Sequence, residues 1–365
     1  MSNSERPAEH FQQESAPVGQ HTLNEILTQP DAWQDAINVV AAKQAELKTL
    51  WGQGQFSEII VTGCGSTHYL SLAVAPLLQS VTGVRSRAVP ASELLLFPEL
   101  ITPREGKPLL VTISRSGRTT ETILAARAFK QVYNCPVLNI GCYPETELDV
   151  ESDLSFVISE GQEQSVVQTR SFSSMLVAAQ AIAALLGGDS LEAMQTLPET
   201  GRQLITGEQE LARQLIESGF ERFYFLGSGL QYGLASEANL KMKEMSLSVA
   251  EAFHFMEFRH GPMSMVNEKT LVVGLLSDTA QSYELDVLRQ MRGLGGKTLV
   301  LADAAVPSDA ADFQVSFNTA IPATRRGVLF LPTLQLLGYY RAIFNGLNPD
   351  QPHNLTAVVV LNGAG

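Results

Sequence analysis

Cysteine and histidine are scarce in this sequence of 365 residues, which has three cysteines and six histidines. The spacing of Cys64, Cys135 and Cys142 fits neither a disulfide framework nor a zinc site. The histidines are scattered and form no metal-ligand pattern with the cysteines. We therefore expect reduced thiols, no metal and no other cofactor.

Long hydrophobic runs are also missing. The longest one, Met175–Leu186, is shorter than the roughly 20 apolar residues that a helix needs to cross a bilayer. Met1–Gln20 is polar and mixed in charge, and it has no apolar centre like that of a secretory signal. These features predict a soluble cytoplasmic protein that does not bind a membrane.

The sequence has few basic residues. It contains 25 Lys and Arg residues and 38 Asp and Glu residues, which gives a formal net charge of −13. Nucleic acids and anionic membranes are bound by basic surfaces, so we expect neither of them as a partner. A phosphate ligand would have to be held by local donors rather than by the field of the whole protein.

The stretch Leu109–Thr122, with the sequence LLVTISRSGRTTET, supplies such donors. Its pattern predicts a strand, a short turn and the start of a helix, whose unpaired N–H groups favour an anion. A helix cap that binds no ligand is the common alternative, but such a cap needs one hydroxyl group. Here four hydroxyl groups lie close together, at Ser114, Ser116, Thr119 and Thr120. We therefore favour a phosphate site, where Gly117 lets a ligand approach the backbone.

The rest of the chain alternates between predicted strands and helices. A short helix over Leu23–Thr28 is expected to end at Pro30, and a longer one, reaching Leu50, is expected to begin at Asp31. The expected parts are a disordered tail at 1–20, N-terminal helices at 21–52, a first domain at 53–189, linking helices at 190–218, a second domain at 219–347 and a C-terminal tail at 348–365.

An internal repeat relates the two domains. Gly63-x-Gly65 after a strand recurs as Gly227-x-Gly229, and Lys107–Thr112 recurs as Lys269–Gly274, in the same order and roughly 160 residues later. Alternation of apolar strands with helices predicts, in each copy, a parallel sheet covered on both faces. The expected fold is α/β, with two tandem doubly wound, flavodoxin-like domains. Both copies lack the third glycine of a dinucleotide-binding motif, so NAD is not expected.

The two copies differ in chemistry. The second has Leu276–Thr279 in place of the hydroxyl-rich turn, and its aspartate would repel a phosphate. It has instead Lys241 and Glu244, three residues apart on one face of a predicted helix. A solvated charge pair is the plain alternative, but neighbouring methionines indicate a packed helix, where a glutamate can act as a general base. His260 follows in the sequence His-Gly-Pro.

With these residues in view, the chain resembles the sugar isomerase (SIS) domain family, and in particular the isomerase half of glucosamine-6-phosphate synthase. The similarity runs from about Leu23 to Leu355. It rests on seven ordered motifs: NEILTQP (Asn24–Pro30), GCGST (Gly63–Thr67), SRSGRTTET (Ser114–Thr122), EQSVVQTRSF (Glu163–Phe172), LKMKE (Leu240–Glu244), FRHGP (Phe258–Pro262) and DQPHNL (Asp350–Leu355).

The resemblance implies roles for individual residues. It implies that Ser114, Ser116 and Thr119 hold a sugar phosphate, and that Glu244 moves a proton between adjacent carbons with Lys241 beside it. The remaining implied site residues are Ser66 and Thr67 near the phosphate and hydroxyls, Arg115 in the phosphate turn, Val166 and Gln168 along the substrate, and His260, a ring-opening residue that the family supplies from a neighbouring subunit. The implied partners are a phosphorylated hexose or aminohexose and a second copy of the chain, in a homodimer with shared active sites.

Departures from the family pattern bear on the reaction. Arg115 stands where the synthase has glutamine, and Gln168 where it has serine. No glutaminase domain is expected, and Ala357 occupies the position of a lysine that forms an imine with the ketose. The sequence therefore favours an aldose–ketose isomerase or an aminosugar-phosphate deaminase. A sensor that binds a phosphosugar without chemistry and a transaminase-like isomerase that uses free ammonia remain as alternatives.

Overall fold

The computed structural model describes residues 17–101 and 105–361. They form two five-stranded sheets, and every pair of neighbouring strands in them is parallel. The first sheet has the order β2-β1-β3-β4-β5, and the second has β10-β9-β8-β6-β7. If β6 to β10 are renumbered 1 to 5, the strand order of the second sheet is 5-4-3-1-2, which is the order of the first sheet read in reverse. The predicted pair of doubly wound α/β domains, related by duplication, is confirmed.

The central strands are apolar because helices cover both of their faces. All seven residues of β3 are buried, as are all six of β1 and of β8. The strands of the first sheet are β1 (Glu58–Gly63), β2 (Ser86–Pro90), β3 (Pro108–Ser114), β4 (Val137–Gly141) and β5 (Leu154–Val157). Those of the second sheet are β6 (Arg222–Gly227), β7 (Val249–Phe253), β8 (Thr270–Leu275), β9 (Lys297–Ala302) and β10 (Phe313–Ser316).

Helices follow the strands in each half. In the first half they are α3 (Ser66–Thr82), α4 (Ala91–Leu96), α5 (Pro98–Ile101), α6 (Thr120–Tyr133), α7 (Glu147–Glu151) and α8 (Arg170–Leu186). In the second half they are α10 (Gln231–Ser246), α11 (Phe255–Phe258), α12 (Gln281–Gly293), α13 (Ala323–Arg326) and α14 (Leu331–Phe344). The remaining helices are α1 (Gln20–Ala42), α2 (Gln44–Gly54) and α9 (Leu197–Glu217).

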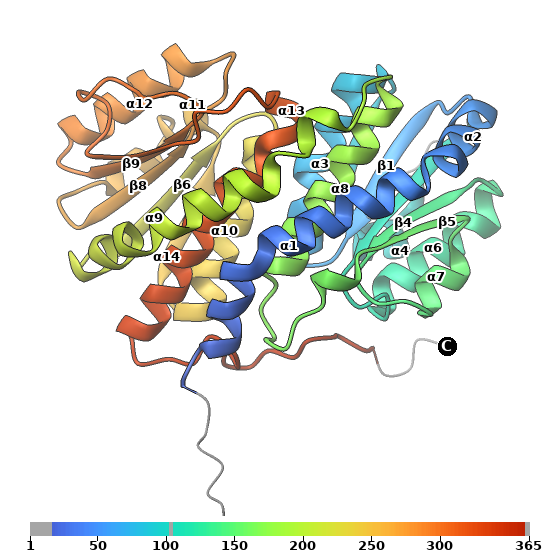
Figure 1. Cartoon of the computed structure of the whole chain (residues 1–365), viewed down its shortest axis with the longest axis horizontal. Coiled ribbons are helices and arrows are strands. Elements are labelled where there is room, and N and C mark those ends of the chain that lie inside the picture. Colours follow the sequence, from blue (N-terminus) through green and yellow to red (C-terminus); the bar gives the residue numbers. More distant parts are fainter. Residues whose placement is uncertain (1–16, 102–104, 362–365) are drawn as a thin grey trace, which may run out of the picture.

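A shared core joins the two halves. Alternate residues of each strand point to opposite faces of its sheet, so Ile59 and Val61 belong to one cluster and Ile60 to another. The first cluster continues through α3 and α8 into α10, α14 and the facing side of the second sheet. Figure 1 shows these long helices between the two sheets, with α1 and α9 alongside. The contact of α3 with α10 brings the two halves together near the carboxyl ends of their strands.

The N-terminal helix corrects one prediction, because α1 runs from Gln20 to Ala42 through Pro30 without the expected break. Proline supplies no N–H for the carbonyl of Ile26 four residues earlier. The side chain of Gln29 replaces that donor, with its Nε2 at 2.7 Å from the Ile26 oxygen. Of the expected disordered tail, residues 1–16 lie outside the described residues, and 17–20 lead into α1.

Other local predictions also needed correction. The helix expected to continue from Asp31 to Leu50 ends at Ala42, and α2 begins at Gln44. Lys43 lies at this break, and its Nζ donates to the carbonyl of Ser155 at 2.7 Å. Strand β2 and the short helices α4, α5 and α7 were not predicted, since short segments carry little periodic signal.

The segment after α14 returns from the second half to the first. Figure 1 shows it passing the N-terminal end of α1 and running along the first domain. Asn348 and Asp350 accept hydrogen bonds there from the N–H groups of Gly19 and Thr22. Within residues 17–101 and 105–361, every helix is too short or too polar to cross a membrane.

Candidate functional site

The candidate site lies where the chain leaves β1 and β3, which are neighbours in the first sheet. The connection from β1 leads to β2 on one side, and the connection from β3 leads to β4 on the other. Such a switch point opens a crevice at the carboxyl ends of the strands, the common place for ligands in open α/β sheets. The two predicted turns, Gly63–Thr67 and Ser114–Thr119, both lie at this crevice.

The turn after β3 is shaped by its own backbone. The N–H of Gly117 donates to Oγ of Ser114 at 3.1 Å, and the N–H of Arg118 donates to Oγ of Ser116 at 3.2 Å. Gly117 has a φ of +60°, and a Cβ there would lie 2.2 Å from Oγ1 of Thr146, so only glycine fits. Because both serine oxygens accept in these bonds, their hydroxyl hydrogens stay available for an anion.

In the second half, a carboxylate of the protein itself occupies the corresponding turn. Glu284 of α12 accepts hydrogen bonds from the N–H of Ser277 at 2.8 Å and from its hydroxyl at 2.9 Å. Asp278 forms an ion pair with Arg326. A carboxylate of the protein thus takes the donors that a phosphate would use, which supports the prediction that the first half alone binds one.

Helix α10 brings three charged side chains together at the junction of the two halves. Nζ of Lys241 lies 2.5 Å from Oε2 of Glu244 and 3.2 Å from Oε1 of Glu237, and it donates to Oγ of Ser66 at 3.0 Å. Burial raises the pKa of Glu237 to about 8, and Lys241 offsets this only in part. Burial lowers the pKa of Lys241, but the two carboxylates outweigh it and the net direction is upward. Near pH 7 the expected state is a protonated Glu237 beside a Lys241–Glu244 ion pair.

A cavity of about 190 Å³ joins these groups to the turn after β3. Seven of the predicted site residues line it: Ser66, Arg115, Thr119, Val166, Gln168, Lys241 and Glu244. Oε1 of Gln168 is buried and finds no hydrogen-bond partner among the described residues, so it is available to a ligand. Cys64, Gly65, Glu121, Val167 and four residues of the C-terminal tail (Leu355, Thr356, Ala357 and Val359) complete the lining.

Three predicted residues take positions next to this cavity rather than in its wall. Ser114 is buried at the end of β3. Ser116 lines an adjoining cavity of about 370 Å³, which shares Arg115 and Ala357 with the first. The hydroxyl of Thr67 bonds to the backbone of Cys64, at 2.9 Å from its N–H and 3.0 Å from its carbonyl, and so shapes the turn after β1.

His260 stands apart from the other candidates in the protomer. It follows α11 on the surface and is exposed. His260 is not one of the described residues that line the cavity of Glu244. If His260 takes part in the chemistry, a second subunit must therefore bring it to the site.

Several residues of the site were missed in the sequence. Glu237 stands four residues before Lys241 on the same helix, a spacing that places both on one face and could have identified it. Of the tail residues that line the cavity, the sequence pointed to Ala357 alone, and Leu355, Thr356 and Val359 carry no ionisable group that could have identified them. Glu163 pairs with Arg115 at 3.1 Å, a contact between segments far apart in the sequence.

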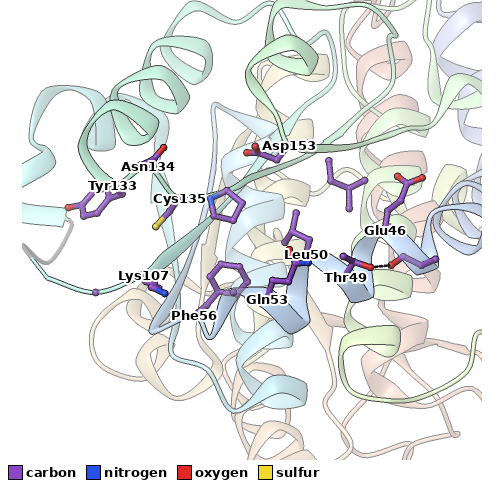
Figure 2. Close-up of a pocket in the computed structure, with 15 residues that line it drawn as sticks. Glu46, Thr49, Leu50, Gln53, Phe56, Lys107, Tyr133, Asn134, Cys135 and Asp153 are labelled. Atoms are coloured by element: carbon purple, nitrogen blue, oxygen red, sulfur yellow. Dashed lines mark hydrogen bonds between the residues drawn. The ribbon is translucent and has the colours of Figure 1, made fainter.

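Another cavity, of about 950 Å³, lies elsewhere. Figure 2 shows Leu50 and Phe56 together with Lys107, Cys135 and Asp153 around it. The last three immediately precede β3, β4 and β5, or lie within two residues of them, so this cavity opens at the amino ends of the strands. It is therefore at the opposite edge of the sheet from the candidate site, and no predicted site residue lines it.

Comparison with known proteins agrees with this arrangement. Glutamine–fructose-6-phosphate aminotransferase of Pseudomonas putida is 30% identical over 362 residues, which cover 93% of this chain and 58% of that protein. The chain spans about three fifths of the length of the curated relatives it matches. The C-terminal domain of glucosamine-fructose-6-phosphate aminotransferase from Francisella tularensis is 28% identical with a TM-score of 0.79, covering 91% of this chain and 98% of that one.

A second solved structure bears on the shorter length. Glucosamine-6-phosphate deaminase from Thermotoga maritima is 28% identical with a TM-score of 0.72, and the match covers 90% of this chain and all of that chain. The SIS domain matches residues 55–185 and 215–330, which correspond to the two sheets and the helices around them. These matches account for more than half of the chain, and the protein belongs to the SIS domain family.

Proposed function

We propose that this protein is an enzyme that acts on a six-carbon sugar phosphate or its 2-amino derivative, with Glu244 as the base. The observation that carries the proposal is the Lys241–Glu244 ion pair, which faces the cavity beside Ser66 and the hydroxyl-rich turn. A phosphate held at that turn leaves the sugar chain extended toward α10. The proposal is supported by the relatives, which by name are phosphosugar aminotransferases, one of them isomerizing, and a phosphosugar deaminase.

The chemistry requires one proton to move between adjacent carbons. After ring opening, Glu244 removes the proton from C2, and the electron pair forms a C1=C2 double bond. The C1=O π bond breaks at the same time, and its electrons pass to O1, which takes up a proton. When the C2 hydroxyl then loses its proton, a C2=O bond forms and the electrons of the C1=C2 bond take up a proton at C1, which gives a ketose. With an amino group at C2 the same steps give an imine, which one water molecule hydrolyses to a ketose phosphate and ammonia. Lys241 stays protonated beside Glu244 and donates to groups whose charge develops during the transfer.

Release of ammonia from an aminosugar phosphate is the reaction we favour. Synthesis of the aminosugar needs an ammonia source and, in the resembling synthase, a lysine where this chain has Ala357. Deamination needs only the base and water. The match to a glucosamine-6-phosphate deaminase along that chain's whole length adds support. Aldose–ketose isomerisation, which uses the same base, is the nearest competitor.

A homodimer with shared sites completes the proposal. His260 is exposed and outside its own protomer's cavity, while the resemblance assigns ring opening to it. In the proposed dimer, each His260 reaches the cavity of the other subunit and protonates the ring oxygen as the sugar opens.

The test is to incubate the purified protein separately with glucosamine 6-phosphate and glucose 6-phosphate, and to measure ammonia and ketose. Ammonia from the first supports a deaminase, and ketose from the second alone supports an isomerase. The Glu244→Gln variant should bind both sugars and form no product. Glu251→Gln, which removes an exposed carboxylate from β7, is the matched control and should keep wild-type activity.

Two results would contradict the proposal. Binding of both sugars without any product would favour the phosphosugar sensor. Formation of glucosamine 6-phosphate from fructose 6-phosphate and ammonium, with no measurable reverse reaction, would favour the transaminase-like isomerase that uses free ammonia.

A further inference from the structure

Three motifs that have no part in the chemistry above meet in the structure. They are NEILTQP (Asn24–Pro30) on α1, the start of EQSVVQTRSF (Glu163–Phe172) and DQPHNL (Asp350–Leu355) in the tail. The middle one carries Val166 and Gln168, which line the cavity. The last one leads directly into the tail residues that cover it.

Glu25 holds the start of the cavity loop. Its side chain is buried, and Oε1 accepts hydrogen bonds from the N–H of Gln164 at 2.6 Å and of Ser165 at 3.2 Å. The hydroxyl of Ser165 donates to Oε2 and lies 3.0 Å from the carbonyl oxygen of Val167. Three donors of the loop thus end on one carboxylate of α1.

Asp350 holds the start of the tail on the same helix. Its Oδ1 accepts from the N–H and from the hydroxyl of Thr22, each at 2.7 Å, one turn before Glu25. The backbone carbonyl of Asp350 accepts the N–H of Val166 at 3.1 Å. The contacts therefore form a closed ring, from Glu25 through the loop to Asp350 and back through Thr22 to α1.

Neither segment has regular structure of its own to fix it. Residues 162–169 lie between a short 3-10 turn and α8, and residues 346–361 follow α14 without helix or strand. Backbone N–H groups in such segments need acceptors, and carboxylates make the strongest hydrogen bonds to them. Contacts with α1 therefore help to fix both segments: Glu25 supplies acceptors to the loop, and Thr22 supplies donors to Asp350 of the tail.

We infer that Glu25 and Asp350 are positioning residues, which fix the cavity loop 164–168 and the tail 355–361 relative to each other and over the bound sugar phosphate. Neither residue lines the cavity itself. The two segments move as one unit, because the N–H of Val166 ends on the residue that anchors the tail. This inference rests on the proposed function for its ligand, but the coupling itself exists in the free protein.

The second half of the protein supplies a matched control. Glu284 is as buried as Glu25, each with 2% of its surface exposed, and it likewise accepts the N–H and the hydroxyl of a serine. Burial also raises the pKa of both carboxyls. Removal of either side chain should cost comparable stability, but Glu284 does not touch the cavity loop or the tail.

The experiment compares Glu25→Ala, Glu25→Gln, Asp350→Ala and Glu284→Ala with the wild type. Amide hydrogen exchange is followed in peptides that cover 162–169 and 346–361, in the free protein. Glu25→Ala should speed exchange at least tenfold in both segments, although the hydrogen bonds that Glu25 accepts come from Gln164 and Ser165 of the loop. Glu25→Gln, which keeps an acceptor oxygen, should restore protection, and Asp350→Ala should release both segments.

A second readout is the affinity for glucitol 6-phosphate, an open-chain compound that cannot react. Glu25→Ala and Asp350→Ala should weaken its binding at least tenfold, with Glu284→Ala within threefold of the wild type. Faster exchange confined to 162–169, or equal effects of Glu25→Ala and Glu284→Ala on both segments, would overturn the inference. Absence of sugar-phosphate binding in the wild type would reject the proposed function, while the exchange data would still decide on the coupling.

Discussion

Nη2 of Arg115 donates a hydrogen bond to the carbonyl oxygen of Ala357 at 3.0 Å. These are two of the positions at which the sequence departs from the family pattern, with arginine for glutamine and alanine for lysine. The turn after β3 therefore holds the tail through its backbone, and residue 357 needs no functional side chain for this contact. The same guanidinium pairs with Glu163, whose side chain is fully buried.

The first prediction concerns this contact. Arg115→Gln removes the ion pair with Glu163 and the bond to Ala357, so it should raise KM for the sugar phosphate and expose the tail to proteolysis. The free energy of unfolding should fall by about 2 kcal/mol, less than the roughly 3–5 kcal/mol of a broken buried pair, because Glu163 keeps the N–H groups of Thr169 and Ser171 as donors. Urea denaturation and limited proteolysis measure the two effects.

Arg127→Gln is the matched control for that variant. Arg127 pairs with Glu147 and Glu151 on the surface, where such pairs contribute about 0.5 kcal/mol or less. It should leave KM and the tail unchanged. An equal rise in KM for both variants would mean that Arg115 does not hold the tail over the substrate.

The second prediction places phosphate recognition in the first half. Ser116→Ala combined with Thr119→Ala removes two hydroxyl donors, each worth about 1.5–3 kcal/mol toward a charged group. Affinity for glucose 6-phosphate, measured by calorimetry, should fall about a hundredfold or more. Thr279→Ala, in the corresponding turn of the second half, should change nothing. Unchanged affinity in the double variant would place the phosphate elsewhere.

The sequence alone predicted the repeated architecture well, because buried parallel strands are continuous apolar runs with turn residues at their ends. It also identified Lys241 and Glu244, since their spacing on a helix is a local property. It could not show that α10 reaches Ser66, because that contact depends on how α3 and α10 pack across the two halves. The break predicted at Pro30 is absent from α1, since the side chain of Gln29 supplies the donor that proline lacks.

The closed ring of hydrogen bonds around Glu25 could not be predicted from the sequence, for a similar reason. Its members come from α1, from the loop before α8 and from the tail, so they meet only after the whole chain has folded. The sequence showed these three motifs, but it did not show which of their side chains accept hydrogen bonds from the other two segments. Burial, which raises the pKa of Glu25, likewise depends on neighbours distant in the chain, with Glu163 adding to the shift.

The third prediction concerns Glu237. Burial raises its pKa to about 8, so it carries a proton near neutral pH, and Glu237→Gln mimics that neutral state. At pH 7, kcat/KM of the variant should stay within about twofold of the wild type. Above pH 8 the wild type should lose activity, since an ionised Glu237 draws Lys241 from Glu244, and the variant should not. An inflection near pH 8 that persists in Glu237→Gln would assign it to another group.

The fourth prediction tests the shared site. Glu244→Gln and His260→Ala should each abolish turnover as homodimers. After mixing and subunit exchange, mixed dimers contain one site with neither substitution, so part of the activity should return. Mass spectrometry of differently tagged subunits verifies the exchange. Mixed dimers without activity would place His260 in the site of its own subunit, and an active His260→Ala homodimer would place it outside the mechanism.

The fifth prediction concerns stability and pH, through a carboxyl far from the site. Glu208 of α9 is buried, and burial raises its pKa to about 7, an effect that Thr333 offsets only in part. Between its unfolded pKa near 4.5 and this value, the folded protein binds more protons than the unfolded chain. Its contribution to stability is therefore fully present below pH 4.5 and is lost progressively as the pH rises to about 7.

Glu208→Gln removes this dependence, because the amide stays neutral at every pH. The free energy of unfolding of the variant, relative to the wild type, should rise by roughly 3 kcal/mol between pH 4.5 and pH 8. Glu210→Gln on the same helix is the control: hydrogen bonds from Arg213 and Gln214 lower the pKa of that exposed carboxyl, so its pH dependence has the opposite sign and falls mostly below pH 4.5. Between the two pH values, the stability of this variant relative to the wild type should change little. Urea denaturation of the three proteins at both pH values measures the difference. Parallel curves for Glu208→Gln and the wild type would mean that Glu208 is already ionised in the folded protein, with water or an ion reaching it between α9 and α14.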